Sequence, residues 1–216
     1  MAKIEPFEKH TDRYEEWFEE HRELYRWELK AIERLLPAFS EGVEIGIGTG
    51  RFALPLGIRL GIEPSPKMAA RAMEKGLEVI PGTAEEIPLP DESVDFALIV
   101  TTICFVDDPR KALREIRRIL RPGGWVIVGF VDRETPLGRY YLEHRNESRF
   151  YAPATFFSAK EVAGLLREAG FGELEAVQTL FGECLESMEG GIRPGWGEGA
   201  FVVIRGRKVE NPERTE

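Results

Sequence analysis

The feature that most constrains the fold is an alternation of short apolar runs with helical segments. Five apolar runs have the length of buried strands: Val43–Ile47, Ile58–Glu63, Leu77–Ile80, Val94–Val100 and Trp125–Val131. Between them, Ser65 before Pro66 is typical of an N-cap followed by proline at the first helical position. Asp108 and Pro109 repeat this signal. Strands that alternate with helices of roughly 10–12 residues form a parallel sheet with both faces covered. An α/β fold is therefore predicted.

The segments before and after this core differ in character. Between residues 7 and 36, aromatic and apolar residues recur every three to four positions, which predicts one or two amphipathic helices ending before Pro37. Residues 132–157 are polar and aromatic and have no clear period. We expect the first segment to form a helical cap over 1–40. The second is expected to form an insertion on the substrate side.

The last third of the chain contains one more helix and two more strands. Ser158–Glu161 is a capping box that begins a helix ending at Gly170. Strands are predicted at Glu173–Phe181 and Ala200–Arg207, separated by a glycine-rich loop at 190–199. The chain is thus predicted to be a single domain over 1–208, with a frayed tail at 209–216.

Composition excludes several classes of protein. The 216 residues suit one domain, and no apolar run approaches the ~18 residues of a membrane span. The charged N-terminus lacks a signal sequence, which predicts a soluble, cytoplasmic protein. The net charge of −9 disfavours nucleic acid and anionic membranes as partners. Two distant cysteines and three scattered histidines predict neither a disulfide nor a metal site. Scarce Asn and Gln beside abundant Glu and Arg fit a thermophilic source or a biased genome.

A glycine-rich turn follows the first predicted strand. In Glu44-Ile45-Gly46-Ile47-Gly48-Thr49-Gly50, alternate glycines let the backbone turn sharply and approach a ligand. A helix is expected next, with its N-terminal amides aimed at the same place. Glu63 ends the second strand, where a carboxylate can accept both hydroxyls of a ribose. The pattern predicts a nucleotide-like ligand.

The same region also satisfies a dinucleotide-binding pattern. Gly48–Ala53 reads G-x-G-x-x-A, but Glu63 comes only ten residues after Ala53 and no second catalytic domain follows. A nicotinamide-dependent oxidoreductase therefore remains an alternative.

Four motifs in order resemble the class I S-adenosylmethionine-dependent methyltransferases of the small-molecule type, similar to the ubiquinone and menaquinone biosynthesis enzymes. The resemblance covers roughly Val43 to Phe181. Its motifs are Glu44–Gly50, Gly61–Met68, Gly82–Asp95 and Arg118–Gly124. It implies a Rossmann-like sheet of seven strands, of which the first five are parallel and the last is antiparallel.

The resemblance also implies S-adenosylmethionine as cofactor and S-adenosylhomocysteine as product. The residues carried over as cofactor-binding are Glu44, Gly46, Gly48, Gly50, Glu63, Pro64, Met68, Thr83, Ala84, Glu85 and Thr101. Thr83 stands where the family usually has an acid that accepts the adenine amino group. A hydroxyl can accept the same hydrogen bond, more weakly because it is uncharged.

The sequence constrains the binding site of the methyl acceptor less than it constrains the binding site of the cofactor. By analogy with the family, Tyr14, Trp17, Tyr140 and Tyr141 could wall an acceptor pocket, although the first two could equally pack their helix onto the domain. His144 is a candidate base. The predicted function is methyl transfer to a small-molecule acceptor; a non-catalytic S-adenosylmethionine-binding regulator is the second alternative.

Overall fold

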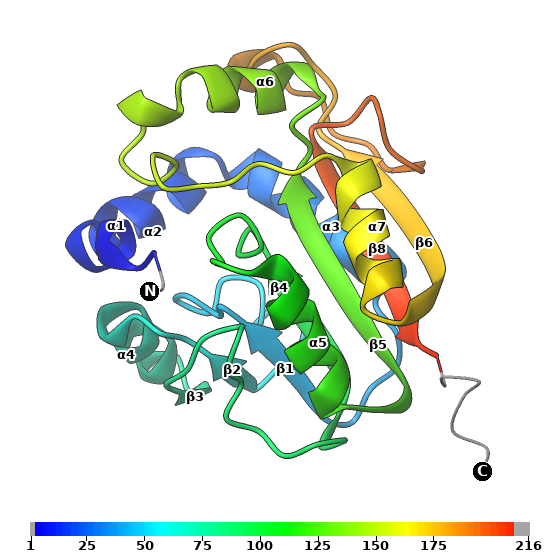
Figure 1. Cartoon of the computed structure of the whole chain (residues 1–216). Helices are drawn as coiled ribbons and strands as arrows, with labels where there is room; N and C mark the ends of the chain where they lie inside the picture. The colour runs from blue at the N-terminus through cyan, green and yellow to red at the C-terminus, as the bar shows by residue number, and fades with distance from the viewer. Residues whose placement is uncertain (1–2, 210–216) are drawn as a thin grey trace.

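A single mixed sheet of eight strands organises the molecule, and the computed structural model describes residues 3–209 (Figure 1). The strands are β1 Gly42–Ile45, β2 Leu60–Ile62, β3 Glu78–Ile80, β4 Val94–Val100, β5 Leu120–Val131, β6 Phe171–Thr179, β7 Arg193–Pro194 and β8 Phe201–Lys208. Their order is β3-β2-β1-β4-β5-β8-β6-β7. The pairings among β1 to β5 are parallel, and β8 inserts antiparallel between β5 and β6, as the resemblance implies.

The sheet has one strand more than the seven predicted. The extra strand, β7, is two residues long and lies in the glycine-rich loop, where it pairs with β6 and forms the edge of the sheet. Gln178 holds it there: its side-chain amide donates to the Pro194 carbonyl at 3.2 Å, and its carbonyl accepts from the Glu198 and Gly199 backbone amides. A single glutamine thus converts part of a loop into a short edge strand.

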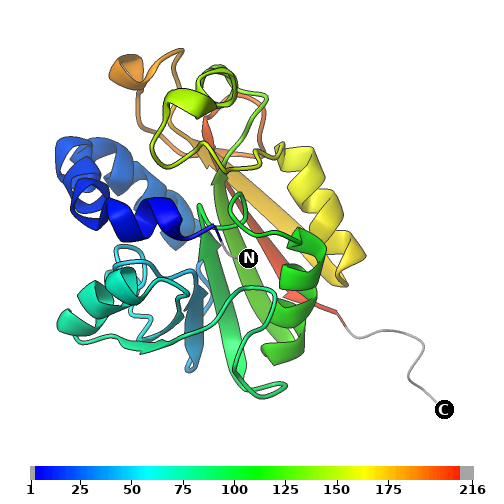
Figure 2. The ribbon, with the colours of Figure 1, turned by 60° about the vertical axis from the view of Figure 1, so that its left-hand side comes forward.

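Helices cover both faces of the sheet (Figure 2). They are α1 Glu5–Lys9, α2 Thr11–Glu20, α3 Arg22–Leu35, α4 Pro66–Glu74, α5 Pro109–Ile119, α6 Pro136–Glu143 and α7 Ala159–Glu168, with 3-10 turns η1 Arg145–Glu147 and η2 Leu185–Ser187. The apolar sides of α5 and α7 pack in one core cluster. The apolar side of α3 packs in the other, on the opposite face.

The helix starts predicted from sequence are confirmed. Ser65 accepts from the Met68 amide at the start of α4, and Asp108 accepts from the Lys111 amide at the start of α5. Ser158 and Glu161 form the capping box of α7. These local signals were sufficient because each cap involves residues only three positions apart.

Two segments differ from expectation. The helix expected after the glycine-rich turn does not form: residues 49–57 are a series of turns. Pro55 has no amide hydrogen to donate and Gly57 has φ +75°, so too few residues remain for a helix. Conversely, the aperiodic segment 132–157 contains α6, which begins with Thr135 as N-cap before Pro136. The predicted tail, beyond residue 209, lies outside the described residues.

Candidate functional site

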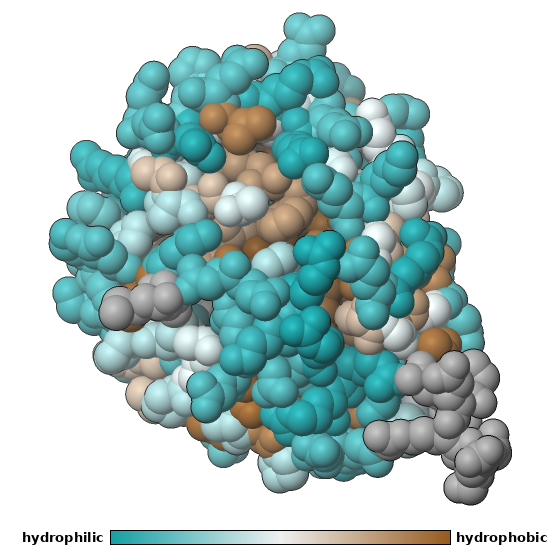
Figure 3. Space-filling model, in the orientation of Figure 1, coloured by the Kyte–Doolittle hydropathy of each residue, from teal (hydrophilic) through white to brown (hydrophobic). Residues whose placement is uncertain are grey.

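A cavity opens at the carboxyl ends of β1, β2 and β4, the edge at which open α/β sheets bind ligands. The turn after β1 and the start of the loop after β4 line one part of it, and α1, α2 and the segment 137–151 line another. In Figure 1, α6 and the α1–α2 pair lie at this end of the sheet. Figure 3 shows apolar side chains gathered below α6 on a face that is otherwise mostly hydrophilic.

Two glycines of the turn after β1 line the cavity. Gly46 has φ +71°, and a Cβ there would lie 2.5 Å from the Thr102 side chain. Gly48 has φ +56°, and its missing Cβ faces the Met68 methyl at 3.4 Å and the Tyr14 hydroxyl at 3.5 Å. Bare backbone is therefore presented to the cavity at both positions. Gly50 is different, because a Cβ there would lie 2.2 Å from Leu77 in the core.

The carboxylate of Glu63 joins the ends of β1 and β2. One oxygen accepts from the Gly48 amide at 2.8 Å and the other from the Ser65 amide at 2.8 Å. The residue is 7% exposed and lines the cavity, and burial raises the pKa of its carboxyl to about 7. Each oxygen keeps a free lone pair, so the carboxylate can still accept from two ligand hydroxyls.

The loop after β3 supplies a second wall. Thr83, Ala84 and Glu85 line the cavity beside Pro64 and Met68. The Glu85 carboxylate accepts from the Asp107 amide at 2.7 Å and so ties this loop to the loop after β4. The adenine contact predicted for Thr83 stays a prediction.

A strained residue directly follows β4. Thr101 has φ +47°, a region that β-branched residues rarely adopt. The Thr101 amide donates to the Gly129 carbonyl at 2.8 Å, and the Thr101 carbonyl accepts from the Cys104 thiol at 3.2 Å. Such strain clusters at ligand sites, and Thr101 lines the cavity. Burial raises the pKa of Cys104 to about 12, which keeps it a thiol rather than a nucleophile.

The structure does not bring Glu44 into the cavity lining. Its side chain is 1% exposed, one of its oxygens has no hydrogen-bond partner, and burial raises the pKa of its carboxyl well above the ordinary value. The Ala53 amide donates to this carboxyl and opposes that rise.

The aromatic candidates separate into two groups. Tyr14, Trp17 and Tyr141 line the cavity. Tyr140 is 54% exposed and stacks on His144 with ring centres 4.3 Å apart, and neither residue is part of the lining. The cavity lining therefore includes three of the four predicted rings, and His144, the candidate base, lies outside it. The acceptor-binding role of these rings stays a prediction.

Further rings close the cavity between α1 and the segment before α7. Phe7 contacts Phe105 and Phe150 with centroids 4.9 and 5.5 Å apart, and Tyr151 packs on Phe105 at 6.2 Å and Tyr141 at 5.1 Å. These edge and stacked contacts join segments far apart in sequence. They could not be found from periodicity, because four of the five rings lie outside regular helices or in the short α1.

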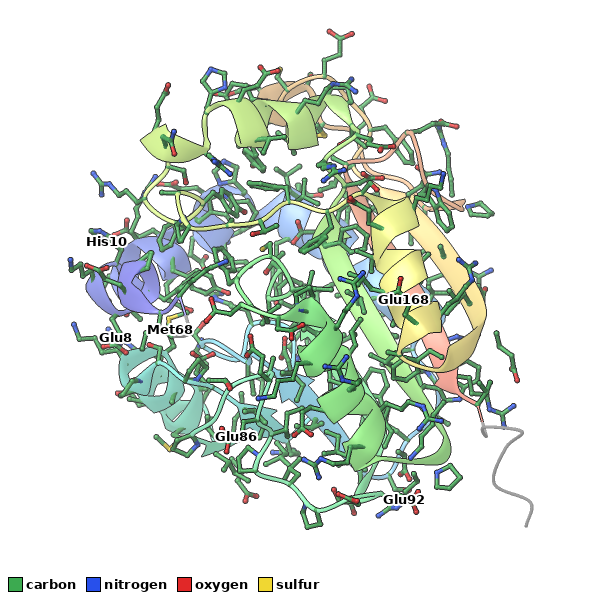
Figure 4. The ribbon with its side chains drawn as sticks, in the orientation of Figure 1. Glu8, His10, Met68, Glu86, Glu92 and Glu168 are labelled. Carbon is green, nitrogen blue, oxygen red and sulfur yellow. The ribbon has the colours of Figure 1, made fainter. Side chains whose placement is uncertain are left out.

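Polar contacts hold α1 and α2 against the turns that line the cavity. The Glu15 carboxylate pairs with Arg51 at 2.6 Å and Lys75 at 3.4 Å, and accepts from the Thr49 hydroxyl. Glu8 accepts from the Ser65 hydroxyl and from the Lys67 amide, and Figure 4 shows Glu8 beside Met68 where α1 meets α4.

Glu28 of α3 is a cavity residue that the sequence interpretation missed. It is 6% exposed, and burial raises the pKa of its carboxyl to about 8. A signal was present: Leu24, Ile32 and Leu35 mark the apolar face of this helix, and Glu28 occupies the same face one turn after Leu24. A carboxylate on a core-facing stripe is informative because buried charge is costly.

Within residues 3–209, no three His, Cys, Asp or Glu side chains gather as metal ligands. The helices of the same residues are all too short or too polar to cross a membrane.

Comparison with known proteins identifies the family. Residues 43–128 match the methyltransferase domain family. A crystal structure from Thermotoga maritima is 55% identical, covers 95% of this chain and 99% of its own, and has a TM-score of 0.92; it is described as a SAM-dependent methyltransferase, possible histamine N-methyltransferase. The chain belongs to the S-adenosylmethionine-dependent methyltransferases. Uncharacterized proteins of Methanocaldococcus jannaschii (41% identical, 94% of this chain and 98% of that protein) and Mycobacterium tuberculosis (35% identical, 88% and 70%) are also similar.

The cavity of this methyltransferase fits the family's cofactor, S-adenosylmethionine. A Cβ at Gly48 would project toward Met68 and Tyr14, so only glycine leaves that space free. The buried Glu63 carboxylate retains acceptor capacity for two hydroxyls. The more specific resemblance to quinone-biosynthesis enzymes stays a prediction.

Proposed function

We propose that this methyltransferase methylates a small molecule that binds in the cavity beneath α1, α2 and the segment 137–151. The observation that carries the proposal is the shared cavity: the Gly46–Gly48 turn and Glu63 line one part, and Trp17 and Tyr141 line another. A cavity roofed by packed aromatic rings suits a compact acceptor rather than a polymer. The net charge of −9 also disfavours nucleic acid.

Cofactor binding is assigned to the side formed by the turn after β1 and the loops after β2 and β3. Glu63 would accept the ribose hydroxyls, and Thr83, Ala84 and Met68 would contact adenine. Gly46 and Gly48 would let the backbone approach the methionine part, with Thr101 across from them. Tyr14 belongs to this side, since its hydroxyl lies by Gly48.

When bound, S-adenosylmethionine would supply an activated methyl group for transfer to the acceptor and would leave as S-adenosylhomocysteine. The protein's residues need to align the acceptor and exclude water, and such positioning contributes several kcal/mol. The Phe7, Phe105 and Phe150 contacts provide an apolar roof for this purpose. A general base is required only when the acceptor arrives protonated.

The domain organisation reflects the two sides of the cavity, one for the cofactor and one for the acceptor. We propose one domain over 1–208, in which residues 1–40 cap the cavity and 132–157 shape its acceptor side. Both segments contribute lining residues, including Tyr14 and Tyr141.

The test is transfer of a labelled methyl group from S-adenosylmethionine to a panel of small aromatic amines, phenols and quinols. Histamine belongs in the panel because the Thermotoga maritima relative is described as a possible histamine N-methyltransferase. Turnover of any acceptor would support the proposal and contradict a non-catalytic role. Methylation of protein or RNA substrates alone would overturn it.

A further inference from the structure

Glu28 is a carboxylate without a protein partner in an apolar wall. It is 6% exposed and lines the cavity, and within the described residues 3–209 it forms no hydrogen bond or ion pair. Its neighbours on the same face of α3, Leu24 and Ile32, are apolar. Helix packing by itself would favour an aliphatic residue here.

The groups around Glu28 place it on the acceptor side. Its charge adds to the effect of burial in raising the pKa of Tyr141 on α6 and of Tyr151 before α7. The charge of Glu28 also adds to the rise in the pKa of Tyr25, which lies on the same helix, α3. Glu63, by contrast, interacts with Gly48, Ser65 and Glu8. The two cavity carboxylates therefore have separate surroundings.

A buried carboxylate of this kind is costly unless a ligand compensates it. Burial is the sole cause of its raised pKa, so no cation of the described residues offsets the loss of water. A positively charged ligand would supply both the opposite charge and N–H donors. Aromatic rings that line the same cavity, including Trp17 and Tyr141, can also hold a cation against their faces.

We propose that Glu28 binds the methyl acceptor, and that the acceptor is a small amine whose ammonium group pairs with this carboxylate. This inference rests on the proposed function, because it assumes that the acceptor enters the cavity. Phenols and quinols would leave the carboxylate without a counter-ion, and carboxylic acids would be repelled by it.

The test measures binding to protein saturated with S-adenosylhomocysteine, by calorimetry at pH 8.5, where Glu28 with its pKa of about 8 is mostly ionised and the amines are still protonated. Tryptamine and 2-phenylethylamine are compared with tryptophol and 2-phenylethanol, which have the same frame without the charge. We expect the amines to bind at least tenfold more tightly than the alcohols. Glu28→Gln should abolish that preference and leave S-adenosylhomocysteine binding unchanged. Glu23→Gln removes the same charge from an exposed position of α3 and should behave as wild type.

Three outcomes would overturn the inference. The wild type could show no preference for the amines, whether or not the alcohols bind, or Glu28→Gln could retain the preference. In the third outcome, Glu28→Gln would weaken the binding of S-adenosylmethionine but not that of S-adenosylhomocysteine. The partner of Glu28 would then be the sulfonium of the cofactor. If the wild type does not bind S-adenosylhomocysteine, the proposed cofactor site is wrong and the inference fails with it; normal binding without an amine preference contradicts the inference alone.

Stability gives a second readout that a structural role would not produce. Because burial raises the pKa of Glu28 from 4.5 to about 8, its ionisation lowers the stability of the fold progressively between these two pH values and by a constant amount above pH 8. Tyr25, Tyr141 and Tyr151 stay neutral across this range because their pKa values are raised, and Glu186, whose charge acts on Tyr141, is the same in both proteins. Glu28→Gln should therefore raise the urea midpoint at pH 9 and leave it unchanged at pH 4. A lower midpoint at both pH values would indicate a structural residue.

Discussion

At the scale of single residues, two glycines with similar backbone angles have different reasons to be glycine. Gly46 and Gly57 have φ +71° and +75°. A Cβ at Gly46 would lie 2.5 Å from Thr102, whereas a Cβ at Gly57 would have nothing within 4 Å. The pair separates the cost of the left-handed backbone from the cost of steric overlap.

We expect Gly57→Ala to lower the free energy of unfolding by about 1–2 kcal/mol, the cost of a left-handed backbone angle. Gly46→Ala should lower it by about 1–3 kcal/mol more, because the Thr102 side chain must also move. Urea unfolding followed by circular dichroism measures both values. Equal losses for the two variants would show that the turn relaxes freely around Thr102.

The Glu63 carboxylate predicts a pH dependence of cofactor binding. Because burial raises its pKa to about 7, with the nearby Glu8 adding to the rise, the carboxyl is mostly ionised at pH 8 and mostly protonated at pH 6. If hydroxyl groups bind the ionised form, affinity for S-adenosylhomocysteine should fall roughly tenfold from pH 8 to pH 6. Calorimetric titration at the two pH values measures the change.

Glu63→Gln should weaken this binding about 10- to 100-fold at pH 8, because a charged acceptor is lost, and should remove the pH dependence. Glu86→Gln is the matched control, an exposed glutamate on the neighbouring loop (Figure 4). A Glu63 variant that binds as tightly as the Glu86 variant would contradict the assignment of the ribose site.

At the scale of secondary-structure elements, ion pairs connect α2 to the glycine-rich turn, and Glu15 is the shared partner of two of them. Glu15 pairs with Arg51 and Lys75 while about three-quarters buried. Glu15→Ala removes the shared partner of two cations, so we expect about 1–3 kcal/mol of lost stability and faster amide exchange across residues 5–20. Exchange in α3 should be unchanged, because α3 packs on β6 and β8 independently of this contact.

Glu16→Ala is the control on the same helix. Glu16 is exposed, and its one ion pair within residues 3–209 is with Arg13, three positions earlier, so its loss should change stability by less than about 0.5 kcal/mol. Equal exchange rates in the two variants would show that the aromatic contacts of Phe7 and Tyr14, rather than the ion pairs, hold these helices in place.

At the scale of the whole molecule, ligand binding should stabilise the fold by mass action. S-adenosylhomocysteine at about 100 times its dissociation constant adds about 2.7 kcal/mol. For a chain of 216 residues this is roughly 5–10 °C in the melting temperature. NAD⁺ and NADP⁺ serve as controls in the same thermal-shift assay. A shift with either dinucleotide and none with S-adenosylhomocysteine would contradict the cofactor assignment.

The elements that sequence predicted best are those whose signals are local. The caps at Ser65, Asp108 and Ser158 each depend on contacts within one turn of helix, and all three helices form where predicted. The helix expected after Gly50 does not form, because Pro55 and Gly57 are unfavourable in a helix. The general pattern of a strand followed by a helix therefore does not hold here. The edge strand β7 could not be foreseen, since it depends on Gln178, which lies sixteen positions before Pro194.

The α/β class, the glycine-rich turn and the acid at the end of β2 could be predicted from residue patterns, because period and spacing encode which residues share a strand end. Which of the predicted residues meet depends on how the chain folds in three dimensions. The fold placed Tyr14 and Tyr141 in one cavity, left Tyr140 and His144 outside it, and put Glu28 in the lining of the same cavity. These relations depend on contacts between segments distant in the chain, and no local pattern of residue types records such contacts.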